Sequence, residues 1–165
     1  MWRACLLGLC LLLGACAART PLPDTTPALV DALPLTLHIR REQAGEQRDW
    51  LLVLQAEGGA LRWSLLDPLG MPLSRQLLEA GAWHNDGLLP PNSEARELFA
   101  ALLFALTPDE QLSARYPAGR WQLTAGQRQL APQWRIDYRA PLDFTLYTTD
   151  ALTYRVTALT SEDGS

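Results

Sequence analysis

The sequence has no lysine, only 2 histidines and only 3 cysteines among its 165 residues, and 19% of it is charged. All 14 basic residues are arginines, and with 18 acidic residues the formal net charge is -4. Nucleic-acid binding needs a basic surface, so this balance argues against it. The hydrophobic fraction of 48% is too high for a disordered chain, and the length is that of one ordinary domain.

Motifs of covalent catalysis and of phosphate binding are also missing. There is no Gly-x-Ser-x-Gly, no glycine-rich phosphate loop and no paired-carboxylate signature. His38 falls within a predicted strand, and His84 lies near Asp86 in a predicted turn. Two ligands at that spacing are weak evidence for a metal, so we interpret His84 and Asp86 as solvated turn residues. We predict that the protein is not an enzyme and binds no metal.

The N-terminus resembles a bacterial lipoprotein signal. After Arg3, residues Ala4 to Leu13 form an apolar run that is too short to cross a membrane as a helix but suits a signal peptide. The run ends in Leu13-Gly14-Ala15-Cys16, which resembles the lipobox. Cys10 follows Leu9 rather than a small residue and is the poorer candidate. The alternative is an ordinary signal peptide with a chance cysteine.

If the signal is cleaved before Cys16, the composition of the mature chain and its attached groups follow. Residues 1–15 are the predicted signal peptide, and Cys16 would carry a diacylglycerol and an N-linked acyl chain as the only attached groups. Cys5 and Cys10 would leave with the signal, so no disulfide could form. In similar lipoproteins an aspartate after the cysteine favours the inner membrane. Ala17 therefore points to the periplasmic face of the outer membrane.

The segment that follows is rich in proline. Residues 16–34 contain Pro21, Pro23, Pro27 and Pro34. Such a composition is typical of an extended segment, and we predict a flexible tether. One helical turn over Ala28 to Leu33 is the alternative for part of it.

Residues 35–160 alternate as an antiparallel sheet would. Apolar side chains recur at every second position in several short segments that are separated by turns. The predicted strands contain Leu35 to Arg40, Trp50 to Leu54, Leu61 to Leu65, Leu73 to Leu78, Trp121 to Leu123, Trp134 to Tyr138, Phe144 to Leu146 and Leu152 to Val156. Residues 161–165 are expected to be a loose tail.

Two helices are predicted between these groups of strands. Asn92 is a typical N-cap, and the residues from Leu98 to Leu106 are apolar around the whole circumference of the helix. Such a helix should be buried. Thr107, Pro108 and Glu110 match a capping box that would begin a second, short helix ending near Arg115. The fold class is therefore α+β and mainly β, a curled antiparallel half-barrel around a central apolar helix.

One local motif suggests a family. The segment Leu61 to Gly70, with its Pro68-Leu69-Gly70 loop, resembles the strand and loop of the outer-membrane lipoprotein receptor LolB. The later order of helix, Trp-containing strand and Ile-x-Tyr strand is also similar. The resemblance implies a LolA/LolB-like half-barrel over a hydrophobic cavity. It also implies that Leu69 inserts into the membrane and that a LolA-like periplasmic carrier is a partner. The helix that LolB has before its first strand is shortened and proline-rich here.

Large apolar side chains are the candidates for lining such a cavity. Burial of acyl chains gains about 0.8 kcal/mol per methylene, so an apolar lining alone could hold a lipid. The candidates are Trp50, Leu52, Trp63, Leu65, Phe99, Leu102, Trp121 and Trp134. The alternative interpretation is that they are simply the core, and that Leu69 is an ordinary turn residue.

The functional hypothesis combines the anchor with the fold. We expect an outer-membrane lipoprotein that binds or transfers hydrophobic cargo, either the acyl chains of a lipoprotein or another lipid. The alternative is a scaffolding lipoprotein of an envelope export complex, which would keep the anchor and the sheet but need no cavity.

Overall fold

A computed structural model describes residues 19–159 of the chain. The predicted signal peptide, Cys16 and the tail at 161–165 lie outside the described residues. The first five strands are β1 (Leu35–Gln43), β2 (Glu46–Glu57), β3 (Ala60–Leu66), β4 (Pro72–Glu79) and β5 (Ala82–Asn85). The helices are α2 (Ser93–Leu106) and α3 (Asp109–Arg115). The last strands are β6 (Trp121–Thr124), β7 (Gln127–Leu130), β8 (Trp134–Ala140), β9 (Asp143–Tyr147) and β10 (Thr153–Ala158).

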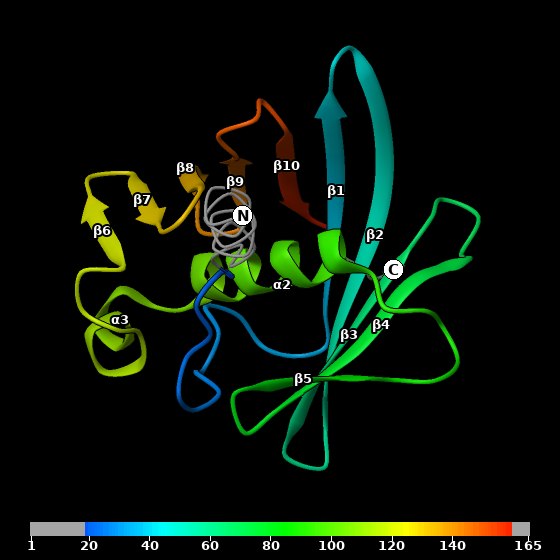
Figure 1. The fold of residues 1–165 in the computed structure, drawn as a ribbon, viewed down its shortest axis with the longest axis horizontal. Coiled ribbons are helices and arrows are strands. Elements are labelled where there is room, and N and C mark those ends of the chain that lie inside the picture. Colours follow the sequence, from blue (N-terminus) through cyan, green and yellow to red (C-terminus); the bar gives the residue numbers. More distant parts are fainter. Residues whose placement is uncertain (1–18, 160–165) are drawn as a thin grey trace, which may run out of the picture.

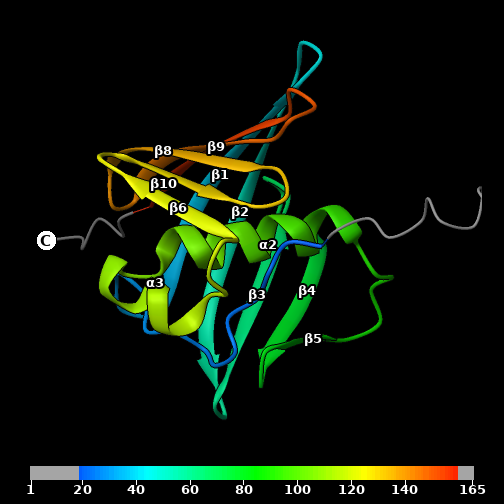
Figure 2. The same cartoon turned by 60° about the vertical axis from the view of Figure 1, so that its left-hand side comes forward.

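The described strands form one open antiparallel sheet with the order β5-β4-β3-β2-β1-β10-β9-β8-β7-β6. The sheet curls, and α2 lies across its concave side (Figures 1 and 2). This confirms the predicted mainly β fold with helices, in which a curled sheet surrounds an apolar helix. β5 and β6 are the two edges, so the barrel does not close.

The core lies between the concave face of the sheet and α2. Alternate residues of β1, β2 and β3 point inward, as the period-two pattern predicts, and their side chains are almost wholly buried. Every residue of α2 from Leu98 to Leu106 is buried, which confirms the prediction of a helix covered on all sides. Asn92 is its N-cap, with Oδ1 accepting from the Ala95 amide at 3.0 Å.

The predicted capping box at the second helix is wrong. Thr107 is fully buried, and its hydroxyl donates to the Leu103 carbonyl at 2.7 Å instead of accepting from α3. Pro108 takes the cap position without a side-chain hydrogen bond. The hydroxyl of Thr107 is used by the end of α2 because a buried Thr readily bonds the carbonyl four residues back.

The prediction of a flexible tether is wrong for residues 19–34. Thr20 is buried, and Leu22, Leu29, Val30 and Leu33 pack against the core. Backbone bonds join the Val30 amide to the Leu106 carbonyl at 2.8 Å and the Asp24 amide to the Arg115 carbonyl at 3.3 Å. The segment has no helical turn over residues 28–33. It crosses the outer side of both helices, seen in blue in Figure 2, and helps to bury α2.

Candidate functional site

Five of the proposed cavity-lining residues lie in the core. Leu52, Trp63 and Leu65 project from β2 and β3, and they meet Phe99 and Leu102 from α2 in the same cluster. All five are 0–1% exposed. A side chain without accessible surface borders no space that admits water, so in this structure the interior at these positions is packed, not hollow.

Aromatic contacts join the sheet to α2 at this point. The Trp63 ring lies 5.3 Å from that of Phe99 and 5.7 Å from that of Trp83, measured between centroids. Trp83 in turn lies 5.9 Å from Phe99. This three-ring cluster fills the space between β3, β5 and the helix. Aromatic pairs in such tilted and edge-on arrangements add about 0.5–1.5 kcal/mol each beyond their buried area.

The other three proposed lining residues lie nearer the surface. Trp50 is half-buried and packs on Tyr154, with centroids 6.2 Å apart. Trp134 is 4% exposed and Trp121 is half-buried. Both of these border a surface groove of about 470 Å³ next to β6 and β8. The eight residues therefore divide between a packed interior and its rim.

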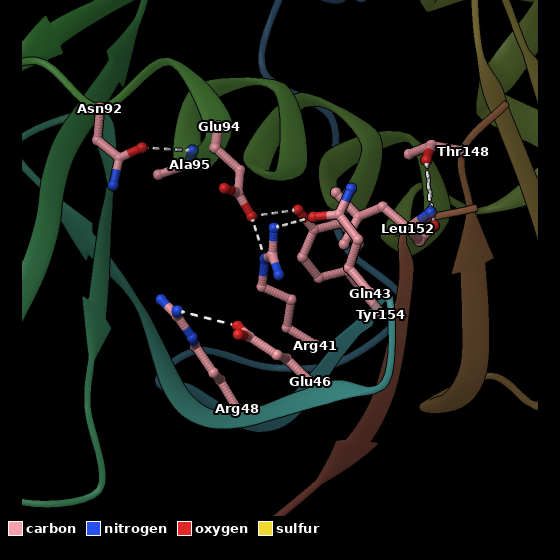
Figure 3. A network of polar contacts seen from close by, with 10 residues as sticks. All are labelled: Arg41, Gln43, Glu46, Arg48, Asn92, Glu94, Ala95, Thr148, Leu152 and Tyr154. Carbon is pink, nitrogen blue, oxygen red and sulfur yellow. Dashed lines mark hydrogen bonds and ion pairs between the residues drawn. The ribbon is translucent and has the colours of Figure 1, made fainter. Parts of the chain in front are cut away.

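The N-terminal end of α2 is fastened to β1 and β10 by Glu94. Its Oε1 accepts from Arg41 Nε at 2.6 Å and from the Tyr154 hydroxyl at 2.7 Å (Figure 3). Arg41 also donates to Gln43 at 2.7 Å. Burial raises the pKa of Tyr154, and the hydrogen bond and charge of Glu94 raise it further. The phenol therefore stays protonated and acts as a donor.

Two more contacts hold the same end of the helix. Arg96 donates to Gln76 on β4 at 3.1 Å and to Asn85 on β5 at 2.6 Å. Glu97 accepts from the amide and the hydroxyl of Thr20, and that hydroxyl also accepts from Trp134 Nε1 at 2.8 Å. Thr20 thus binds the N-terminal segment to α2 and β8.

The C-terminal end of α2 is held by one buried guanidinium, that of Arg128 on β7. Arg128 Nη1 donates to the carbonyls of Phe104, Ala105 and Thr107 at 2.7, 3.2 and 2.8 Å, and Nη2 donates to Asp109. The guanidinium also lies over the rings of Phe104 and Tyr138. It satisfies carbonyls at the helix end that have no partner within the helix.

Tyr138 on β8 adds a second donor at that end. Its hydroxyl donates to the Ala105 carbonyl at 2.9 Å. Burial raises the pKa of Tyr138, although the charge of Arg128 opposes the shift. The sequence interpretation missed Arg128, because an arginine in a polar four-residue strand carries no sign of burial.

The loop between β3 and β4 exposes two apolar side chains. Leu69 is 89% exposed and Met71 is 62% exposed. Asp67 shapes the loop, since its Oδ1 accepts from the amides of both residues at 2.9 Å. Gly70 has a φ of 80°, in the left-handed region that glycine adopts at least cost. A structured turn thus presents Leu69 and Met71 to solvent.

His84 and Asp86 do not lie in a simple turn as predicted. Trp83 to Asn85 belong to strand β5, and the Asp86 carboxylate pairs with Arg62 at 2.9 Å and Arg75 at 3.1 Å. His84 is exposed. Within residues 19–159 no group of three or more His, Cys, Asp or Glu side chains is placed to bind a metal ion. In the same range no helix is long and apolar enough to span a membrane.

Two comparisons with known proteins bear on the site. The model of a family described as "Protein of unknown function (DUF3261)" matches residues 35–157, which include β1 to β9 and nearly all of β10. No curated protein matches the sequence.

Proposed function

The chain belongs to the DUF3261 family, whose function is unknown, and we propose that it is a lipid-anchored protein that binds or transfers hydrophobic cargo. One observation carries the proposal. The concave face of an open sheet and a helix that is apolar all round meet across a continuous apolar interface. An acyl chain could replace contacts there at a gain of about 0.8 kcal/mol per methylene that it buries.

The packed interior defines how cargo would enter. Leu52, Trp63 and Phe99 have no exposed surface, so cargo must take the place of contacts between the sheet and α2. Apolar packing holds the middle of the helix, and polar contacts fasten its two ends, Glu94 at the first and Arg128 at the last. We therefore propose that α2 is the element that moves when cargo binds, as a LolA/LolB-like lid would.

Leu69 is the proposed membrane-inserting residue. Its exposure and the ordered turn around Asp67 support this role, because an apolar side chain held in water gains free energy by entering a bilayer. The proposed anchor is the acylated Cys16, on the periplasmic face of the outer membrane. A LolA-like carrier is the proposed donor of cargo.

Native mass spectrometry tests for cargo. The protein to use is residues 16–165 with Cys16→Ala, exported behind a cleavable secretory leader; we name this the released chain. We expect the spectrum to contain a protein–ligand complex whose excess mass equals that of a co-purified lipid or acylated peptide. Collisional activation in the gas phase should release this ligand. A released chain that is folded by circular dichroism and never carries or takes up lipid would overturn the proposal.

Leu69→Asp separates insertion from cargo binding. We expect the released chain with this change to take up a fluorescent acylated peptide normally and to pass it to vesicles about tenfold more slowly, the loss of one inserted leucine. Leu88→Asp is the matched control, because Leu88 is equally exposed but lies in the loop after β5. Equal transfer rates for the two variants would contradict the role of Leu69.

The scaffold is the second candidate function. The same packed interior favours it, since a protein that only positions partners needs no space between its sheet and its helix. The lipid measurement distinguishes the two, because a scaffold would remain free of cargo at every stage of purification.

A further inference from the structure

A small hollow on the convex face of the sheet lies apart from the apolar interior. It has a volume of about 100 Å³ and is lined by His38 and Arg40 of β1 and by Arg155 and Thr157 of β10. This volume exceeds the roughly 30 Å³ that one water occupies and is far below the size of a drug-sized pocket. The hollow therefore suits a small ion or one charged group of a larger molecule.

Strand register places two arginines directly opposite each other at this hollow. Arg40 pairs with Arg155 across β1 and β10, and His38 pairs with Thr157 one step further along. Two like charges directly opposite in an antiparallel pair repel one another. Each arginine is paired with one aspartate, and an anion between the two guanidiniums would add a further attraction to both.

Each arginine is held in place by one aspartate and uses only part of its guanidinium. Arg40 donates through Nε to Asp49 at 3.1 Å, and Arg155 donates through Nη2 to Asp143 at 2.9 Å. Within residues 19–159 the two guanidiniums make no other side-chain hydrogen bonds. Their other N–H groups remain able to bind a ligand, and both arginines are partly exposed.

Histidine and threonine complete the set of groups. His38 Nε2 lies 2.8 Å from the same Asp49 oxygen that accepts from Arg40, so this carboxylate fixes both side chains. Thr157 contributes a hydroxyl from the neighbouring strand. Planar guanidiniums that bind oxyanions by paired N–H groups, together with a hydroxyl, are the usual ligands of a phosphate group.

We propose that this hollow binds a phosphate group. Two sources share that chemistry, free inorganic phosphate and the phosphate of a lipid headgroup. The register supports the second source, because His38 pairs with Leu51 and Leu51 with Leu66, which directly precedes the Leu69 loop. Two strand spacings of about 4.8 Å put His38, at the near side of the hollow, roughly 10 Å from Leu66 on the same face. The inference does not depend on the interior binding cargo.

Titration of the ¹⁵N-labelled released chain by nuclear magnetic resonance tests the site. One arm uses inorganic phosphate, and the other uses dihexanoyl phosphatidic acid below its micellar concentration. We expect saturable shifts centred on the amides of residues 38–40 and 155–157. Saturation by either ligand supports the site and identifies its source, whereas saturation by neither overturns the proposal.

Variants distinguish specific binding in this hollow from non-specific attraction of the anion to positive charge. We expect Arg155→Gln to weaken binding about tenfold, because it removes charge-assisted hydrogen bonds, and Thr157→Val to weaken it less. Arg48→Gln is the matched control, since it removes the same charge from an exposed side chain on β2. Equal weakening by Arg48→Gln and Arg155→Gln would show that no site exists. Retention of the wild-type spectrum elsewhere in each variant confirms that it has folded.

Discussion

At its N-terminal end α2 is held through its own exposed or half-buried side chains, Glu94, Arg96 and Glu97. At its C-terminal end the buried guanidinium of Arg128 binds the last carbonyls of the helix, together with Tyr138 and the amide of Val30. On the helix side of the first end Glu94 is 42% exposed, with its partner Arg41 at 13%. At the second end Arg128 is 7% exposed, with its partner Asp109 at 59%. Partly exposed pairs contribute about 0–1 kcal/mol each, while a buried carbonyl left without its donor costs about 1–3 kcal/mol. The comparison implies that the helix opens from its Asn92 end while Arg128 keeps the other end in place.

Arg128→Met should have the largest effect. The change leaves the carbonyls of Phe104, Ala105 and Thr107 without this donor in a buried place, so we expect the free energy of unfolding to fall by about 3 kcal/mol. Urea denaturation of the wild type and the variant measures this difference in the free energy of unfolding. Arg139→Met on the exposed side of β8 is the control and should change stability little. A loss below about 1 kcal/mol for Arg128→Met would remove the contrast between the two ends.

Glu94→Gln should have a moderate effect. It weakens the bonds from Arg41 and Tyr154, and we expect a loss of about 1 kcal/mol that shrinks at high salt. Hydrogen exchange should quicken for the amides in the first turns of α2 and stay unchanged in the last turn. The control is Glu46→Gln, which removes an exposed pair with Arg48 in the same region (Figure 3). If exchange quickens equally along the whole helix, opening does not begin at the Asn92 end.

The smallest effect concerns alkaline pH. The pKa values of Tyr154, Tyr138 and Tyr116 are raised above the ordinary value near 10, so the folded protein keeps three protons that the unfolded chain loses. The contribution of these phenols to stability should therefore be constant below about pH 10 and fall as the pH rises above it. Tyr154→Phe and Tyr138→Phe should each make this fall shallower in urea denaturation series. Equal slopes in wild type and both variants would show that Tyr154 and Tyr138 do not cause it.

Sequence patterns predicted the strands with clear alternation, but they missed two of the three shortest, β5 and β7. β5 and β7 have four residues each, and in β7 the residues between Gln127 and Leu130 are polar. The period-two signal is too brief there to exceed chance. The burial of Arg128 depends on carbonyls at the end of a helix more than twenty residues earlier in the chain, which no local pattern contains.

The candidate site was predicted only in part, again because local patterns do not contain distant contacts. The all-round apolar helix follows directly from local sequence, whereas the exposure of Leu69 was implied by the resemblance of its loop. Residues 19–34 look like a free tether because of their prolines, yet Pro23 and Pro27 are themselves buried. Proline disfavours helix and strand, but it does not prevent an extended segment from packing on a surface that is already apolar. That Arg40 and Arg155 face each other could not be predicted, because it depends on the register of β1 with β10, which only the folded sheet supplies.

The strand order also has a consequence for how quickly the chain can fold. Eight of the nine pairings in the described sheet join strands that are consecutive in the sequence, and only β1 with β10 joins distant ones. β1 to β5 and β6 to β10 can therefore form as two separate meanders from local contacts. The seam between them is the pairing of β1 with β10, to which the Leu159 amide adds a bond to the Thr36 carbonyl at 2.9 Å. Forming this seam has the entropic cost of closing one long loop of chain. Changes in that seam should slow refolding, whereas changes in the outer hairpins should mainly speed unfolding.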